Sequence, residues 1–326
     1  MATNATRFSL VRMLLRATQS RSGQLRRKGF TLIELLVAII VGSLIVGTLL
    51  YVVVELLQIN RREEILTQTQ QDMRRAIDYM SRDISEAIFV YASPDAVTDE
   101  LTDLPANTTP VLAFWRLDPV DTSGLNCGDF QGDNQRDQLA ECTTLRIRQS
   151  MYTLVVYLHA DNSSNDIWSG PARIIRYELP KYTAGGINSL NQRTGYLDPS
   201  IANNFDDWTR NPDDNTTDGF AVVLTDHVDS IGAEDDPQAC PEANYVRSPE
   251  DSDSFFACVL AGDVANPDTS LVLQTRTNQS VQLALRGNTE TNAGQIGLAG
   301  TSEASRLPTL ETEVLIRGVV QKQPGS

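Results

Sequence analysis

The sequence predicts an α+β protein in which one long N-terminal helix precedes a domain rich in antiparallel strands. Three observations lead to this prediction. Residues 30–54 are almost entirely apolar, the segment that follows is amphipathic with no proline or glycine up to residue 90, and the remainder alternates short strand-like runs with polar loops. A helix followed by a run of strands is typical of α+β folds.

The apolar segment at residues 30–54 reads FTLIELLVAIIVGSLIVGTLLYVVV and contains one charged residue, Glu34. As a helix with a rise of ~1.5 Å per residue, it would reach roughly 37 Å. That length crosses the hydrocarbon layer of a bilayer with some tilt. Residues 30–54 are therefore expected to form a transmembrane segment.

Charge is divided sharply along the chain. Residues 1–29 contain seven basic residues and no acidic ones, and removing them changes the formal net charge from −15 to −22. The basic residues are Arg7, Arg12, Arg16, Arg21, Arg26, Arg27 and Lys28. Basic residues before a membrane span keep that end in the cytoplasm, so we expect the acidic remainder on the outer side. Such an acidic body repels phosphate backbones, and no nucleic-acid partner is expected.

Three interpretations fit the N-terminus to different degrees. A secretory signal has a shorter apolar core that ends at a small-residue cleavage site, whereas this apolar run continues into YVVVELLQIN. A plain inner-membrane anchor explains the length and the basic flank but gives no role to Gly29 or Glu34. A third interpretation, in which both residues have a function, accounts for every feature.

Lys28-Gly29 followed by FTLIELL at residues 30–36 and by an unbroken apolar helix resembles the type IV pilin and type II secretion pseudopilin superfamily. The resemblance implies that residues 1–29 are a prepilin leader, which a prepilin peptidase removes by cutting between Gly29 and Phe30. It also implies that the new N-terminal amine of Phe30 is methylated and that Glu34 becomes the fifth residue of the mature chain. The resemblance is dense around this motif and faint beyond residue 90.

Glu34 needs a partner because a carboxylate inside hydrocarbon is costly. By resemblance, that partner is the methylated N-terminal amine of a neighbouring subunit or of the same one. A salt bridge in a medium of low dielectric constant would set the assembly register, since half of it leaves a buried unpaired charge. The alternative is that Glu34 snorkels to the headgroups.

Small residues in the span could let helices approach closely or let the helix loosen. These residues are Gly42, Ser43, Gly47 and Thr48.

The segment at residues 55–90 is predicted to continue the same helix as an amphipathic half. An apolar stripe recurs at spacings of three and four, at Met73, Ile77, Met80, Ile84 and Ile88. We expect the helix to end near Val90, before Pro94, and its second half to pack on the sheet. A coiled-coil stalk is the alternative, but the heptad is short and interrupted by polar residues.

Residues 91–326 are expected to form one β-rich periplasmic body. Several apolar runs alternate with polar residues, which predicts half-buried antiparallel strands. These runs are residues 111–117, 144–148, 151–158, 173–179, 220–225, 255–261, 270–275, 281–286 and 313–320. Polar loops rich in Asn, Asp, Ser, Thr and Gly separate them.

Within the superfamily, the chain resembles the J-type minor pseudopilins and the PilW-like minor pilins, and also the minor pseudopilins of hormogonium polysaccharide secretion. Residues 72–87 and the pair of runs at 151–158 and 173–179 carry this resemblance. It implies a non-enzymatic minor subunit in the initiation or tip complex of a type II secretion or type IV pilus filament, supporting secretion or motility. The implied partners are other minor and major pilins or pseudopilins, the prepilin peptidase and the inner-membrane assembly platform. The implied location is a single pass through the inner membrane with a periplasmic body.

The four cysteines form two local pairs in sequence, Cys127 with Cys142 and Cys240 with Cys258. Four cysteines permit three connectivities, and local pairing is the simplest in an oxidising compartment. Free buried thiols are the alternative. A zinc site is disfavoured because there is no CxxC spacing and both histidines lie far from the cysteines.

Catalytic motifs are lacking in the sequence: there is no GxSxG, HExxH, P-loop or GxGxxG. Asp226 and His227 are adjacent, but neighbours on a strand point to opposite faces. His159 ends a strand-like run and is expected at a surface turn. We therefore expect a protein that is not an enzyme.

Calcium is the one ligand that the loops suggest, because hard oxygen ligands on flexible loops suit Ca²⁺. The favoured set is Asp213, Asn215 and Asp218, in the stretch 205–219. Two further acidic loops contain Asp129, Asp133 and Asp137, and Glu250, Asp251 and Asp253. None has the DxDxDG spacing, and acidic loops are usually just solvated, so no cofactor is the expectation and calcium the alternative.

A second functional hypothesis is a binding module displayed on the filament that recognises an exported substrate, a polysaccharide or a surface. Trp115, Trp168 and Trp208 could act as stacking platforms for such a ligand. The competing interpretation is that the three tryptophans are aromatic residues of the core.

Overall fold

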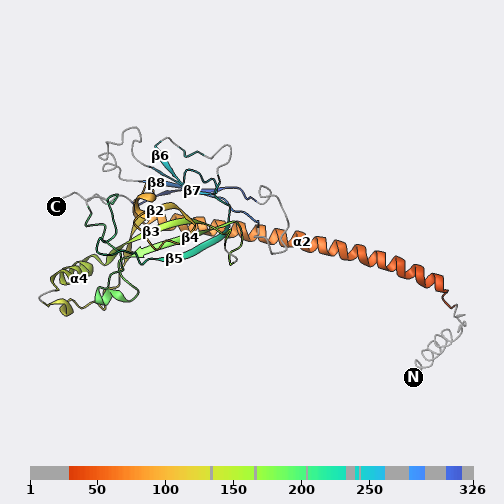
Figure 1. Cartoon of the computed structure of the whole chain (residues 1–326), viewed down its shortest axis with the longest axis horizontal. Coiled ribbons are helices and arrows are strands. Elements are labelled where there is room, and N and C mark those ends of the chain that lie inside the picture. Colours follow the sequence, from red (N-terminus) through yellow and green to blue (C-terminus); the bar gives the residue numbers. More distant parts are fainter. Residues whose placement is uncertain are drawn as a thin grey trace, which may run out of the picture. The chain divides into compact units, whose positions relative to one another are not determined.

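The computed structural model describes residues 29–132, 135–164, 167–202, 205–232, 239–241, 244–260, 279–290 and 306–317. The chain falls into two compact units divided between Ile59 and Asn60. The helix α2 (Leu32–Ser85) belongs to both units, and an antiparallel sheet domain follows it (Figure 1). The fold is α+β, as the sequence predicts.

Two antiparallel sheets make up most of the second unit (Figure 1). The five-stranded sheet has the order β1-β2-β3-β4-β5, and the four-stranded sheet has the order β6-β7-β8-β9. The strands are β1 (Ala87–Val90), β2 (Thr108–Pro119), β3 (Ser150–Asp161), β4 (Ala172–Pro180), β5 (Phe220–Val228), β6 (Tyr245–Ser248), β7 (Phe255–Leu260), β8 (Ser280–Leu285) and β9 (Leu310–Leu315). The short helices are α3 (Asp95–Thr98), η1 (Cys127–Phe130), α4 (Arg136–Arg148) and η2 (Gly186–Ser189).

The main core combines the end of α2 with one face of each sheet. Met73, Ile77, Met80 and Ile84 are buried there, which confirms the predicted apolar stripe. They share one cluster with residues of both sheets, including Tyr157 of β3 and Leu283 of β8. A second cluster covers the opposite face of the five-stranded sheet around Trp115, Trp208 and Tyr196.

The predicted end of the helix is wrong by several residues. The helix α2 ends at Ser85, and Ala87–Val90 form β1, which pairs with β2. Ile88 continues the helical spacing of the apolar stripe, but it lies in β1 and packs in the second cluster. Pairing with a strand that follows later in the chain therefore overrides the local pattern.

Residues 144–148 do not form a strand, and that prediction is wrong as well. They are the last turn of α4. Cys142 and Leu145, three residues apart on this helix, are buried in a third cluster with Phe130 and Tyr182. The alternation of Thr-Leu-Arg-Ile-Arg fits a strand equally well, but only Leu145 of its two apolar residues is buried, while Ile147 is 78% exposed.

Most other predicted strands are confirmed. β2, β3, β4 and β5 contain the expected runs, β7 contains the described part of its run, and β8 ends at Leu285, one residue before its run does. The last strand, β9, covers Leu310–Leu315 and so begins before the predicted run at 313–320. The run at 270–275, residue 261 and residues 318–320 lie outside the described residues.

Candidate functional site

Residues 29–35, which carry the predicted processing site, lead into the first turn of α2. Thr31 precedes the helix and caps it: the Glu34 amide donates to Thr31 Oγ1 at 3.3 Å and to Thr31 O at 3.0 Å. The Leu35 amide donates to the same carbonyl at 3.2 Å. Thr31 and Glu34 have the spacing of a capping box, a signal that our sequence reasoning missed. The helix start is thus encoded two residues after Gly29.

Glu34 lies in the first turn of α2 and is exposed. An acidic side chain is favourable there because the N-terminal end of a helix dipole is positive. Within the described residues, Glu34 forms no ion pair. Within this part of the chain, the start of the helix is the positive group nearest in sequence to the carboxylate.

The first half of α2 is apolar on all sides and uncovered. Its most apolar 18-residue window has a mean hydropathy of 2.7, and none of that window is buried. Phe30 is 80% exposed and Leu32 is 86% exposed. By length and composition, this helix can cross a membrane. An apolar surface of this extent marks contact with lipid or with other helices.

Two hydroxyl side chains within the span donate hydrogen bonds to the helix itself. Ser43 Oγ donates to Ile40 O at 2.9 Å, and Thr48 Oγ1 donates to Ile45 O at 2.9 Å. Both hydroxyls can therefore enter hydrocarbon without an unpaired donor. A Cβ added at Gly42 or Gly47 would meet nothing within 4 Å, so no contact inside the described chain requires glycine at either position.

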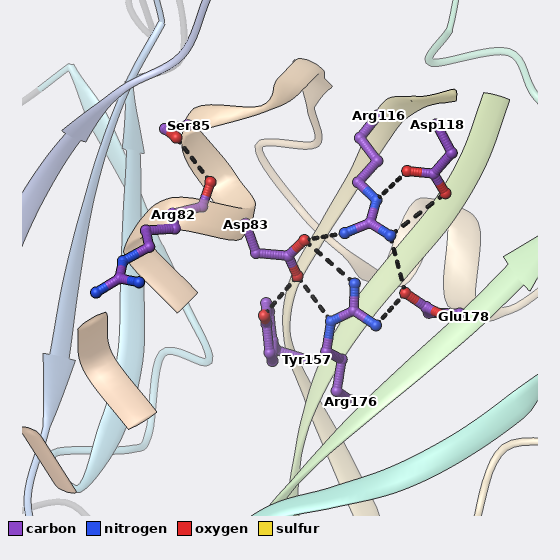
Figure 2. Close-up of polar contacts among 8 residues, drawn as sticks. All are labelled: Arg82, Asp83, Ser85, Arg116, Asp118, Tyr157, Arg176 and Glu178. Atoms are coloured by element: carbon purple, nitrogen blue, oxygen red, sulfur yellow. Dashed lines mark hydrogen bonds and ion pairs between the residues drawn. The ribbon is translucent and has the colours of Figure 1, made fainter. Parts of the chain in front are cut away.

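The last turn of α2 is joined to the five-stranded sheet by a buried ionic network around Asp83 (Figure 2). Arg176 donates to the Asp83 carboxylate through Nε at 2.7 Å and Nη2 at 3.2 Å, and Tyr157 Oη donates at 2.6 Å. Arg116 Nη1 also donates to Asp83. Outer carboxylates complete the network: Arg116 Nε lies 2.7 Å from Asp118, and Arg116 Nη2 lies 3.2 Å from Glu178.

Electrostatics keep Asp83 charged in this buried position. Burial raises the pKa of its carboxyl, but the hydrogen bonds and charges of Arg176, Tyr157 and Arg116 outweigh burial and lower the pKa below its usual value. In sequence, Asp83 follows Met80 by three residues and so lies on the apolar stripe. That spacing is the signal in the sequence that Asp83 faces the core.

Both local cysteine pairs form disulfides. Cys127 and Cys142 are joined with a Cα–Cα distance of 5.6 Å, and Cys240 and Cys258 with a Cα–Cα distance of 5.8 Å. The first bond ties η1 to α4, and the second ties β7 to the segment before β6. This is the pairing that the local spacing favours.

The two histidines occupy structural positions in the second unit. The prediction that His159 lies at a surface turn is wrong, because it is buried in β3 with Nε2 2.9 Å from Asp229 O. Burial lowers the pKa of His159, although Asp229 and Asp161 act in the opposite direction. His227 Nδ1 lies 3.3 Å from Asn288 O.

Two of the three tryptophans belong to the core. Trp115 and Trp208 are 0% and 2% exposed, and their rings meet edge to face with centroids 5.5 Å apart. Neither can stack on a ligand from solvent. Trp168 is half-buried and lines a surface groove.

The structure does not gather the calcium candidates into a site. Asp213, Asn215 and Asp218 are all exposed, and Asp218 pairs with Arg193 at 3.3 Å. In the second acidic loop, Asp129 accepts from Asn126, and Asp133 lies outside the described residues. In the third loop, Asp253 pairs with Arg247. In the part of the chain that the structure describes, no group of three or more histidine, cysteine or acidic residues could hold a metal ion.

Comparison with known proteins adds one finding. Residues 24–50 match the family model of the prokaryotic N-terminal methylation motif. No curated protein and no solved structure shows a significant match to the chain. The matched segment includes Gly29, Phe30 and Glu34 and leads directly into α2, and this combination fits the pilin and pseudopilin family.

Proposed function

From this prepilin-type N-terminus, we propose that the chain is a non-enzymatic minor pilin or pseudopilin subunit of a type II secretion or type IV pilus filament. A prepilin peptidase removes residues 1–29, and the amine of Phe30 is methylated. The mature chain crosses the inner membrane once and places its acidic body in the periplasm. The observation that carries the proposal is the methylation motif at residues 24–50 running into a fully exposed apolar helix.

The local structure suits processing between Gly29 and Phe30. Both residues precede α2, and both are exposed, so the peptide bond lies outside regular structure. A Cβ at Gly29 would meet nothing within 4 Å, so no contact with the described residues requires glycine there. Because Thr31 caps the helix from the mature side of the bond, cleavage leaves the helix start intact.

Glu34 is the proposed assembly contact. A carboxylate inside the hydrocarbon layer of a membrane is costly unless it has a partner. A salt bridge to the methylated N-terminal amine of a neighbouring subunit offsets that cost and is specific for register, because a shifted neighbour leaves the charge unpaired.

The rest of the span provides the packing surface. In a membrane, helices associate through close van der Waals packing, for which small residues are favourable. Gly42 and Gly47 have open space around them within the chain. They are therefore free to accept side chains of neighbouring helices.

Processing is tested with Gly29→Arg in the full chain. The expected result is an uncleaved precursor with the electrophoretic mobility of the unprocessed chain, whereas Gly42→Arg, a matched change inside the motif segment, is still cleaved. Mass spectrometry of the wild-type protein should find a chain that begins at methylated Phe30. Normal cleavage of Gly29→Arg, or a native chain that keeps its basic leader, refutes the proposal.

Assembly is tested with Glu34→Ala. This variant should be cleaved normally but should co-purify with other pilin-type subunits at a reduced yield. Glu34→Asp, which keeps the charge on a shorter side chain, should recover part of the yield. Co-purification of Glu34→Ala at the wild-type yield would show that Glu34 does not form the assembly contact.

A further inference from the structure

The strand β5 forms the outer edge of the five-stranded sheet (Figure 1). One side pairs with β4, and along Phe220–Thr225 no other described strand pairs with its second side. This edge is also apolar and open to solvent, because Phe220 is 40% exposed and Val222 is 57% exposed. Backbone donors and acceptors are therefore presented next to exposed apolar side chains.

These side chains lie on the face of the sheet that carries α2. Val222 is opposite Arg176, and Phe220 is opposite Glu178. Directly opposed residues of antiparallel strands project to the same face. Because Arg176 binds Asp83 of α2, Phe220 and Val222 project on the helix side of the sheet.

A groove of about 460 Å³ lies between α2 and this edge. We call it the edge groove; its lining residues are Asp72, Arg75, Ala76 and Tyr79 of α2, Trp168, and residues 223–226 of β5. The four helix residues follow the spacing of one helical face. Tyr79 is 45% exposed and Trp168 is half-buried, so the groove offers aromatic surface for apolar side chains.

Edge strands are normally protected from pairing by charged residues or proline. The run FAVVLT at residues 220–225 contains neither. We infer that the edge groove binds an extended segment of another polypeptide. This segment adds to β5 as a further antiparallel or parallel strand and places alternate apolar side chains against Tyr79, Trp168 and Val222.

Charge identifies the kind of partner. The full chain has a formal net charge of −15, so two copies repel each other. The groove contains Asp72 and Asp226; Arg75 pairs with Asp72 at 3.3 Å, and Asp226 forms no ion pair within the described residues. The bound segment therefore belongs to a different, less acidic chain and has a lysine or arginine beside Asp226.

The test measures binding of a short peptide to the full processed chain in detergent. The probe has alternating Val and Thr and one central Lys. Two control peptides carry either proline at every second position or Glu in place of Lys. The Lys peptide should bind saturably and slow amide hydrogen exchange at residues 220–225. The proline peptide should not bind, because it lacks the amide donors, and the Glu peptide should bind several-fold more weakly.

Two variants distinguish binding in the edge groove from nonspecific binding to exposed apolar side chains. Val222→Lys should weaken binding of the Lys peptide by about tenfold, because it places a charge on the pairing edge. Ile147→Lys makes the same change at an exposed apolar residue of α4 and should leave binding unchanged.

Several results would overturn the inference: no binding of the Lys peptide, equal binding of the proline peptide, unchanged exchange at residues 220–225, or normal binding by Val222→Lys. A dimer of this chain that Val222→Lys dissociates would also overturn it, because the occupant would then be a second copy. The edge groove lies in the second unit and requires neither cleavage at Gly29 nor the charge of Glu34. Failure of the peptide-binding test would therefore leave the proposed filament role intact, and failure of the cleavage or co-purification tests would leave the edge groove intact.

Discussion

The two halves of α2 are one continuous helix with opposite relations to the rest of the chain. Residues 32–54 are apolar on every side, and nearly all of them are exposed. From Met73 onward, only one stripe is apolar, and that stripe is buried in the core together with a charged residue, Asp83. The same backbone conformation thus serves two different environments.

The comparison shows where each half obtains its stability. The second half is stabilised by packing and by ion pairs within its own chain. The first half lacks packing within the described residues, and an apolar surface of this extent is typical of contact with lipid or other helices. Mutations in the two halves should therefore separate folding of the body from assembly.

The largest expected effect follows from Asp83→Ala. It leaves Arg116 and Arg176 without their shared carboxylate, and breaking a buried ion pair costs about 3–5 kcal/mol. Urea unfolding of the full chain in detergent, followed by tryptophan fluorescence, reports on the body alone because all three tryptophans lie beyond residue 60. Asp78→Ala, at an exposed acidic residue of the same helix, should change the unfolding free energy by less than about 0.5 kcal/mol. Equal losses in the two variants would show that the network does not anchor α2.

Met80→Ala tests the apolar part of the same anchor. Met80 is 0% exposed, and truncation of a buried methionine to alanine costs about 2–5 kcal/mol. The same unfolding measurement should show this loss, while cleavage after Gly29 proceeds normally. A loss below about 1 kcal/mol would contradict the tight packing of this site.

A smaller effect is expected from pH, because a single proton is involved. The pKa of buried His159 is lowered from its usual value of 6.5. As the pH falls below that value, the unfolded chain binds a proton that the folded chain resists, so the unfolding free energy decreases. The charged groups that act on His159 are Asp161, Asp229 and Arg173. Between pH 7 and pH 5, His159→Gln should flatten the decrease; identical slopes would refute the assignment.

The smallest effect on the body is expected from Leu44→Ala. Leu44 is 65% exposed in the first half of α2, so the unfolding free energy of the body should change by less than about 0.5 kcal/mol. Removing its apolar surface should instead reduce cross-linking to neighbouring subunits in the membrane. A loss in body stability as large as that of Met80→Ala would erase the distinction between the two halves.

Local patterns in the sequence predicted much of the fold. The apolar run, the stripe at Met73, Ile77, Met80 and Ile84, and six of the strands are confirmed, because each depends on the spacing of neighbouring residues. The prediction of a strand at residues 144–148 failed because a short alternation of apolar and polar residues suits either a strand or a turn of an amphipathic helix. The helix is favoured because it buries Leu145 beside Phe130 and Tyr182.

For the candidate site, the sequence by itself determined the processing motif, the apolar span and the lone carboxylate at Glu34. These features depend only on residues that are adjacent along the chain. Only the tertiary structure decided the partners of Asp83, which lie 33, 74 and 93 residues away along the chain, at Arg116, Tyr157 and Arg176. It likewise decided the burial of His159 and the groove beside β5. Contacts over such separations arise from strand pairing and chain packing, and no local spacing encodes them.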